Sequence, residues 1–346
     1  MRFGTDVQIR AVGAWTPPAL DTTAQAVAEG RLIPEVAQRM GITALPVASD
    51  ISAPDMAVRA ARIALDRALW DGSELDVLIH TWIYHQGHDM WSPPHYIAKL
   101  LGATNCLPLA LHQGCDGGGL ALQDAALRLT ADPASRKALV SSSDRFVLPG
   151  IDRWNFQPSM PLGDSGTAIL LDRSDEPGAA FSLLAVNTYV APELEVLVRG
   201  DRPFADMPMQ VELPFSVLDS ARKGAELLGS VAYDHLTSLV KATLDDAGIE
   251  AHDPRLRYVV LPRIGAGGVA TLYMPALQDL LDVEYLRFDD LTGHLGCGDW
   301  GADLNDLHES RILAPGEMAL LIGAGAGLTW VSAIVQAPEN VTAQGS

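Results

Sequence analysis

The stretch Leu111-His112-Gln113-Gly114-Cys115-Asp116-Gly117-Gly118-Gly119 places a thiol at a glycine-rich turn. An apolar segment ends at this turn, and a helical pattern covers residues 120–129 after it. The positive end of a helix dipole and unpaired backbone N–H groups favour a thiolate over a thiol. The glycines leave room for a substrate carbonyl to approach backbone donors. We therefore predict that Cys115 is a nucleophile and that Gly118 belongs to an oxyanion hole; the alternative is a buried structural cysteine.

Composition narrows the class of protein. The chain has 346 residues, of which 48% are hydrophobic, enough for one large core or two domain-sized cores. No apolar run is long enough to cross a bilayer, and residues 1–6 lack a secretory pattern. A net charge of -19 argues against nucleic acid or an anionic membrane as a partner. Cys106, Cys115 and Cys297 lack metal-ligand or disulfide spacing, so we expect a cytoplasmic protein without a metal.

The two halves of the sequence follow the same order of elements. In the first half, a helical pattern at 55–69 is followed by apolar segments at 76–82, 138–143 and 165–171. In the second half, a helical pattern at 231–247 is followed by apolar segments at 258–262, 318–322 and 328–335. Tyr258 follows Asp76 by 182 positions, and Cys297 follows Cys115 by the same 182 positions. Helices alternating with short apolar strands predict an α/β fold with helices on both faces of the sheets.

The repetition suggests two duplicated units, residues 1–173 and residues 174–346. It places Cys115 and the turn from His294 to Asp299 at equivalent helix N-termini, so packing about a pseudo-twofold axis brings both turns to one active site. The segment 201–214, with three prolines and two methionines, is expected to be an irregular loop rather than a linker.

Three motifs carry a resemblance to a known family. They are the Gly-Cys turn, Pro161-Leu162-Gly163-Asp164-Ser165-Gly166-Thr167-Ala168, and Leu321-Ile322-Gly323-Ala324-Gly325-Ala326-Gly327-Leu328-Thr329-Trp330. In this order they resemble the thiolase superfamily, most closely its ketoacyl-acyl-carrier-protein synthase III type. The resemblance covers nearly the whole chain. It implies a five-layered αβαβα fold, a homodimer, and an acyl thioester delivered by coenzyme A or an acyl carrier protein, with no further cofactor.

The glycine-rich run at 323–327 has two interpretations. It follows a strand, as in dinucleotide-binding proteins, but another strand pattern comes after it. A helix N-terminus that could hold a pyrophosphate is therefore missing. We expect instead that the run packs its backbone beside Cys115 and that Gly325 contributes to the oxyanion site.

Two positions depart from the family's Cys-His-Asn set. Arg263, in Val260-Leu261-Pro262-Arg263-Ile264-Gly265-Ala266, stands where the family has a histidine, and His294 stands where it has an asparagine. Arginine stays protonated and cannot act as a base, which argues against the usual decarboxylative condensation. A histidine near a thiolate suits removal of a proton from an alcohol that attacks an acyl thioester.

The altered set is similar to ketosynthase-like O-acyltransferases of antibiotic biosynthesis, the type that malonylates the sugars of cervimycin. In this hypothesis Cys115 is acylated and His294 activates a hydroxyl, or less readily an amine, of a specialised metabolite. A carboxylate orients the imidazole, with Asp299 as the first choice and Asp303 as the second. A helix cap for Asp299 and a structural role for His294 are the alternatives.

Four further residues are candidates for binding the substrate. Arg263 suits the free carboxylate of a dicarboxylic acyl group such as malonyl, with a structural ion pair as the alternative. Arg153 and Trp154, together with Arg145, are candidates for the mouth that receives the acyl donor, although solvated surface charge is the favoured alternative. The aromatic loop Tyr84-His85-Gln86-Gly87-His88-Asp89-Met90-Trp91, with His95, matches no zinc spacing. The resemblance places this loop and Trp91 near the dimer interface, where it closes an acyl pocket.

Three functions remain open at this stage. The first is acyl transfer from a thioester to a hydroxyl. The second is carbon-carbon bond formation by a starter-unit ketosynthase of a polyketide pathway. The third is a noncatalytic partner that binds acyl carriers. Arg263 counts against the second function, and Cys115 with His294 counts against the third.

Overall fold

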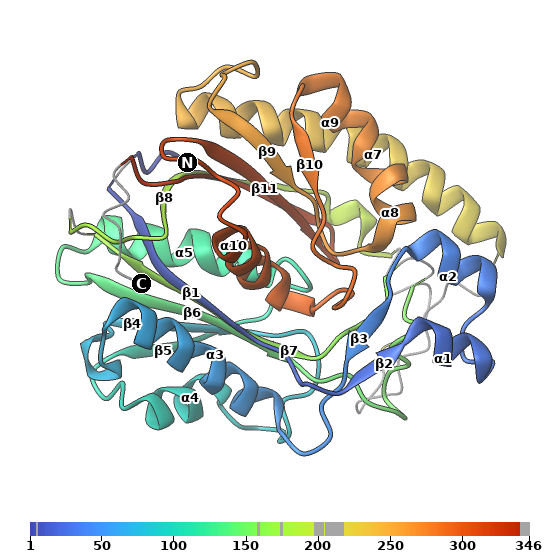
Figure 1. Cartoon of the computed structure of the whole chain (residues 1–346), viewed down its shortest axis with the longest axis horizontal. Helices are drawn as coiled ribbons and strands as arrows, with labels where there is room; N and C mark the ends of the chain where they lie inside the picture. The colour runs from blue at the N-terminus through green and yellow to red at the C-terminus, as the bar shows by residue number, and fades with distance from the viewer. Residues whose placement is uncertain (5, 158–159, 174–175, 197–203, 205–217, 340–346) are drawn as a thin grey trace.

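The computed structural model describes residues 1–346 except 5, 158–159, 174–175, 197–203, 205–217 and 340–346 (Figure 1). The expected loop at 201–214 lies outside the described residues apart from Phe204. The strands of the main sheet are β1 (Gln8–Trp15), β4 (Val77–Thr81), β5 (Leu107–Leu111), β6 (Lys137–Asp144), β7 (Ser165–Asp172), β8 (Phe181–Val190), β9 (Leu256–Val260), β10 (Glu284–Leu286), β11 (Met318–Gly325) and β12 (Thr329–Gln336). In the described part of the chain, ten strands run in the order β10-β9-β11-β12-β8-β1-β7-β6-β4-β5.

The sheet repeats one strand arrangement twice. Counted along the chain within each half, the third strand lies at the outer edge, followed by the second, fourth, fifth and first. The two first strands, β1 and β8, pair antiparallel where the halves meet. The predicted duplication is therefore visible in the strand order. The boundary between residues 173 and 174 falls between β7 and β8 and remains a proposal.

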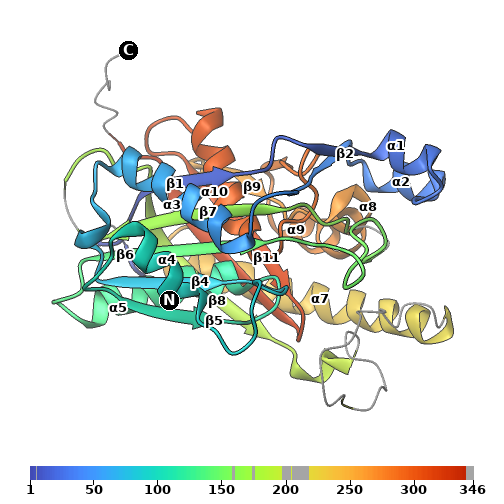
Figure 2. The same ribbon diagram turned by 90° about the horizontal axis from the view of Figure 1, so that it is seen from below.

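Helices form three layers around the two half-sheets (Figures 1 and 2). The first outer layer contains α3 (Ala53–Ala68) and α4 (Pro93–Leu101), and the second contains α7 (Leu218–Ala247), α8 (Gly265–Leu272) and α9 (Met274–Leu280). The central layer contains α5 (Gly117–Ala131) and α10 (Asp299–Ser310). Helix α5 contacts β4 and β6 of one half and β8 and β12 of the other. This is the predicted αβαβα arrangement, and it puts the N-termini of α5 and α10 in the middle of the molecule.

A small extension projects from one end of the molecule (Figures 1 and 2). It consists of the two-stranded sheet of β2 (Leu20–Thr22) and β3 (Ala44–Pro46) with helices α1 (Thr23–Ala28) and α2 (Pro34–Met40). Its apolar side chains, among them Met40 and Leu45, pack around Trp154.

Strand β1 and the first part of helix α7 were not predicted from the sequence. The central strand β1 contains Arg10, which breaks its apolar pattern, yet this arginine is buried because it binds Asp172 on β7 at 2.8 Å. Helix α7 begins at Leu218, well before the predicted start at residue 231. A strand is difficult to recognise from its sequence when a charged residue interrupts the apolar pattern and the residue that pairs with it lies far away in the sequence.

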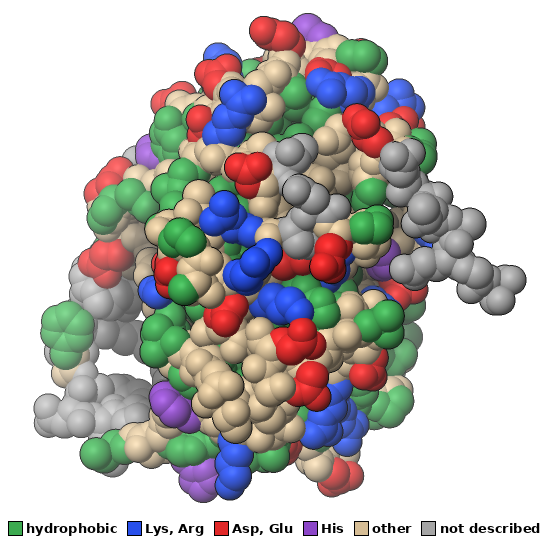
Figure 3. Space-filling model, turned by 90° about the vertical axis from the view of Figure 1, so that its left-hand side faces the viewer, with side chains coloured by type: hydrophobic (Ala, Val, Ile, Leu, Met, Phe, Trp, Pro, Cys, Tyr) green, Lys and Arg blue, Asp and Glu red, His purple; other side chains and the backbone are tan. Residues whose placement is uncertain are grey.

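The surface agrees with the acidic composition. On the face shown in Figure 3, lysine and arginine side chains lie among aspartate and glutamate side chains rather than in a continuous basic patch. Among the described helices, none has the length and apolar character needed to cross a membrane.

Helix α3 packs very closely on β1 and β7 because both strands carry glycine at the contact. A Cβ on Gly13 would lie 2.4 Å from the carbonyl oxygen of Ala60, and one on Gly166 would lie 2.2 Å from that of Met56. The facing residues of α3 are small alanines, including Ala57 and Ala64, which are buried. No side chain fits between these backbones.

We predict that Gly13→Ala lowers the free energy of unfolding by about 1–3 kcal/mol, because the added methyl group forces α3 away from the sheet. Urea denaturation measures the effect. Gly229→Ala is the matched control: a Cβ at Gly229 on α7 meets no atom within 4 Å, and alanine favours a helix. Equal stability of the Gly13 variant and the wild type would contradict this account of the packing.

Candidate active site

Cys115 lies in a turn that joins β5 to α5. Gly114 has a positive φ of 57°, which favours glycine, and α5 begins at Gly117, three residues earlier than the predicted start at Leu120. Asp116 occupies the N-cap position of α5, but its side chain makes no capping hydrogen bond. The half-buried thiol of Cys115 therefore lies beside the N-terminus of a helix, as predicted.

His294 and Asp299 lie in the corresponding turn of the second half. Gly293 and Gly296 have positive φ values of 60° and 64°, which allow the tight turn before α10. The imidazole Nδ1 of His294 lies 2.7 Å from Asp299 Oδ2, and the Leu295 N–H donates to Asp299 Oδ1 at 2.7 Å. Asp299 thus orients the imidazole and also fixes the backbone of the turn. Asp303, the second choice, binds Arg263 instead.

The two turns meet at one small hollow of about 20 Å³, which has room for about one water molecule. Its lining residues are Cys115, Asp116, Pro262, Ile264, His294, Asp299, Trp300, Asp303, Leu321, Ile322, Gly323 and Ala324. Cys115, His294 and Asp299 come from opposite halves of the chain, so the predicted meeting of the two turns is present in the structure.

The imidazole of His294 is buried between two negatively charged groups. Burial alone lowers the pKa of His294, but the negative charges of Asp299 and the Cys115 thiolate, together with the hydrogen bond to Asp299, raise this pKa well above its usual value. The buried Nε2 has no hydrogen-bond partner among the described residues. His294 lines the same hollow as Cys115, where a group of the substrate can exchange a proton with Nε2.

The glycines of β11 pack against the nucleophile turn. A Cβ on Gly325 would lie 2.6 Å from the backbone nitrogen of Asp116, and one on Gly323 would lie 2.7 Å from Asp116 Oδ1. Strand β12 follows at Thr329, so the dinucleotide interpretation of this run is wrong and close backbone packing explains it. Gly118 is placed differently, because a Cβ there would lie 2.3 Å from the Cys297 carbonyl oxygen. The place of Gly118 and Gly325 in an oxyanion hole remains a proposal.

The other two cysteines have structural contacts. Cys297 Sγ donates to the Gly114 carbonyl oxygen at 3.0 Å and accepts from Thr81 Oγ1 at 3.3 Å. Burial raises the pKa of Cys297 well above its usual value, and burial also raises the pKa of Cys106. Both thiols are therefore poor nucleophiles.

Arg263 does not serve as the predicted site for a substrate carboxylate. It is 1% exposed, and its guanidinium donates to Asp303 Oδ1, Phe288 O and Thr292 Oγ1 at 2.8 Å each and to Asp306. Burial lowers the pKa of Arg263, but the charges of Asp303 and Asp306 outweigh burial and raise it. The structure supports the alternative interpretation, a structural ion-pair network.

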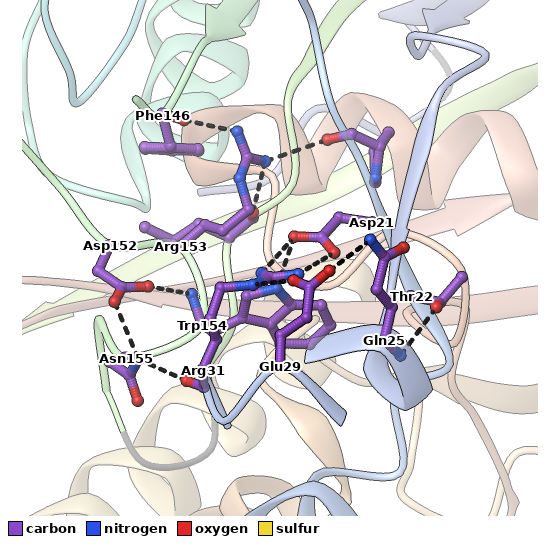
Figure 4. Close-up of polar contacts among 12 residues, drawn as sticks. Asp21, Thr22, Gln25, Glu29, Arg31, Phe146, Asp152, Arg153, Trp154 and Asn155 are labelled. Atoms are coloured by element: carbon purple, nitrogen blue, oxygen red, sulfur yellow. Dashed lines mark hydrogen bonds and ion pairs between the residues drawn. The ribbon is translucent and has the colours of Figure 1, made fainter. Parts of the chain in front are cut away.

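Arg153 and Trp154 likewise do not form a substrate mouth (Figure 4). Trp154 is 1% exposed, and its Nε1 donates to Asp21 Oδ2 at 2.8 Å. Arg153 donates to the carbonyl oxygens of Phe146, Leu162 and Pro46 and to Asp164. The two residues hold the small α1–α2 extension against the main sheet. Both are structural for the same reason as Arg263, since their donors are occupied by other residues of the chain.

The aromatic loop borders a wider surface pocket of about 460 Å³. Its residues Tyr84, Gln86 and Asp89 line the pocket together with Arg145. Trp91 does not; it is 38% exposed and packs edgewise on His88 and Tyr96. Among the residues that the structure describes, no group of three His, Cys, Asp or Glu is arranged to hold a metal ion. A substrate role for Trp91 remains a proposal.

Two further residues border the nucleophile and were not predicted from the sequence. Asp116 is 1% exposed and accepts a hydrogen bond from Trp300 Nε1 at 2.6 Å. Burial raises the pKa of Asp116 to about 8. Its position next to Cys115 was a signal in the sequence, but the partner Trp300 is visible only in the fold.

Comparisons with known proteins agree with this fold. The structure of ChlB3, an acyltransferase, has a TM-score of 0.86 and 31% sequence identity, covering 96% of this chain and 98% of that one. The β-ketoacyl-acyl-carrier-protein synthase III of Clostridium beijerinckii is 24% identical over 337 residues, 96% of this chain and 99% of the relative. The priming β-ketosynthase of the R1128 polyketide pathway has a TM-score of 0.79 and 22% identity, covering 98% of each chain. No protein-family model matches the sequence.

The fold and the cysteine turn are those of a thiolase-superfamily enzyme. Given the identity and coverage with ChlB3, the chain belongs to the ketoacyl-acyl-carrier-protein synthase III-like branch of that superfamily.

The raised pKa of His294 has a consequence for stability. A group with a raised folded-state pKa stabilises the fold fully below its unfolded pKa, about 6.5 for histidine, and this contribution is lost as pH rises through the folded pKa. We therefore predict that the stability advantage of the wild type over His294→Asn is largest at about pH 6 and shrinks towards higher pH. Urea denaturation of both proteins across this range measures it. An advantage that stays constant or grows with pH would contradict the ion-pair account.

Proposed function

We propose that the protein is an acyltransferase that moves an acyl group from a coenzyme A or carrier-protein thioester, through Cys115, to a hydroxyl of a small molecule. One observation carries the proposal: Asp299 holds His294 at 2.7 Å through Nδ1, while Nε2 is buried without a partner in the hollow that contains Cys115. This is the arrangement of a general base beside a nucleophile.

The charges suit a two-step reaction. In the first step, the Cys115 thiolate attacks the thioester carbonyl, and the departing thiolate takes the proton from the His294 imidazolium. Acylation removes the negative charge of Cys115, one of the causes that raise the pKa of His294, so the imidazole becomes free to act as a base. In the second step, the acceptor hydroxyl attacks the acyl group, its proton passes to Nε2, and Cys115 leaves as a thiolate. Backbone donors near Gly325 are candidates to stabilise the oxyanion.

Decarboxylative condensation fits these residues less well. Condensation needs two donors at the oxygen of a malonyl thioester, and Arg263 is committed to Asp303 and Asp306 and does not line the hollow. The names of several relatives favour a starter-unit ketosynthase as the second candidate. A noncatalytic carrier-binding partner would not require the His294–Asp299 bond.

An acyl group of the malonyl type loses the support of Arg263, whose donors are occupied, and keeps the support of the resemblance to ketosynthase-like enzymes that malonylate sugars. Similarity to an acyltransferase and to a polyketide priming enzyme supports an acceptor from specialised metabolism, such as an antibiotic pathway. We also propose a homodimer, in which β5 at the sheet edge, with the exposed Leu107, and the loop that carries Trp91 face the partner.

We predict that a panel of acyl thioesters contains a donor that adds one acyl group per chain, detected by intact mass, and that Cys115→Ala prevents the addition. His294→Ala is expected to load the acyl group and then transfer it to an alcohol about 10²- to 10⁴-fold more slowly, because it lacks only the general base.

Peptide mapping is the control, since the label must reside on Cys115. Acylation of Cys106 or Cys297 instead, or rapid transfer by the His294 variant, would contradict the proposed roles. Loss of loading in the His294 variant would mean that the histidine activates the thiol.

A further inference from the structure

Asp116 follows the nucleophile directly and occupies an unusual position for an N-cap residue. An aspartate there normally accepts hydrogen bonds from the first N–H groups of its helix. In this structure the carboxyl turns away from α5, and its Oδ1 accepts from Trp300 Nε1 on α10 at 2.6 Å. The carboxyl group of Asp116 therefore does not offset the partial positive charge at the N-terminus of α5.

The second carboxyl oxygen of Asp116 does not form a hydrogen bond with any described residue. Oδ2 is buried and has no hydrogen-bond partner among the described residues: the Val331 N–H on β12 faces the carboxyl group but makes no hydrogen bond to it by distance and angle. The side chain is 1% exposed, and Gly323 leaves no space beside Oδ1, where a Cβ would lie 2.7 Å away. A buried carboxylate with one unsatisfied oxygen costs far more free energy than a neutral acid in the same place.

We propose that Asp116 is a positioning residue that works as a neutral carboxylic acid, anchoring the nucleophile turn to Trp300 while leaving the negative charge beside the helix to Cys115. The proposal rests on the proposed role of Cys115 as the nucleophile. It links the two halves of the chain, because Asp116 belongs to the first turn and Trp300 to the helix that carries Asp299.

The groups around Asp116 support a neutral state at neutral pH. Burial, the largest cause, raises its pKa to about 8, and the charge of Asp299 raises it further. The Trp300 bond, the Val331 N–H on β12 and the charge of His294 act in the opposite direction. Asp303 on α10 lines the same hollow.

Two other titratable neighbours belong to further elements. Tyr273, between α8 and α9, and Cys297, in the second turn, are both buried, and the negative charge of Asp116 is among the causes that raise their pKa values. Strand β11 approaches with glycine only, at Gly323 and Gly325. The surroundings thus contain one strong cationic group, the His294 imidazolium, and it is already paired with Asp299.

The test is the rate at which iodoacetamide alkylates Cys115, followed from about pH 6 to about pH 10 by peptide mass mapping. In the wild type, ionisation of Asp116 near pH 8 adds a negative charge beside Sγ, so the alkylation rate should change in a step near pH 8. Asp116→Asn keeps the acceptor for Trp300 without the charge. Its curve should lack this step and match the wild-type rate at about pH 7 within about twofold.

Asp124→Asn is the matched control, because Asp124 lies on the same helix and forms a surface ion pair with Arg128 at 2.7 Å. Its curve should coincide with that of the wild type. Superimposed curves for Asp116→Asn and the wild type, or a loss of more than about tenfold at about pH 7 in Asp116→Asn, would overturn the proposal.

Trp300→Phe provides a second variant if Asp116→Asn does not fold. The Trp300 bond lowers the pKa of Asp116, so its removal should move the step in alkylation rate to higher pH, and no movement would overturn the proposal. Alkylation needs no acyl donor, which separates the two proposals. Failure of every thioester to load Cys115 would refute the acyltransferase while the alkylation curves still decide the role of Asp116.

Discussion

A direct contact between two glycine-rich turns holds the proposed catalytic site together. Cys297 Sγ, from the second half of the chain, donates to the carbonyl oxygen of Gly114, and Gly118 lies against the carbonyl oxygen of Cys297. Because glycine occupies the contact, the N-termini of α5 and α10 approach each other without an intervening side chain. The distance between Cys115 and His294 is thus set by backbone packing at the junction of the two halves. Larger residues in either turn would separate the nucleophile from the base.

The charges of the site follow from this packing. Asp299 and Cys115 both favour the protonated imidazole of His294, whereas Asp116 is buried where its own ionisation is disfavoured. The base therefore has a negative partner on each side, and Asp116 adds a hydrogen bond with Trp300 rather than a charge. This division of roles among three acidic groups comes from burial and hydrogen bonding, since all three lie at the same small hollow.

Local sequence patterns predicted the duplicated α/β fold and the turn at Cys115, and the family resemblance then pointed to His294, with Asp299 as the first choice of partner and Asp303 as the second. The fold and the turn depend on apolar periodicity and glycine spacing. The roles of Arg263, Arg153 and Trp154 could not be predicted, because each binds a partner distant in the sequence: Asp306, the Pro46 carbonyl oxygen and Asp21. Strand β1 was missed for the same reason, since Arg10 is compensated by Asp172. From the sequence, these charged residues were expected to be exposed to solvent or to contact a substrate. In the fold they bind other residues of the chain.

The central claim is that Cys115, His294 and Asp299 form an ester without decarboxylation. It is tested most directly by offering the purified acyl-enzyme a polyol or glycoside in one reaction and a malonyl thioester in another, with carbon dioxide measured in both. The account predicts that the alcohol consumes the acyl-enzyme, gives a product cleaved by mild alkali, and releases no carbon dioxide. Stoichiometric carbon dioxide from the malonyl thioester, with a product that alkali does not cleave, would contradict the account and establish a ketosynthase.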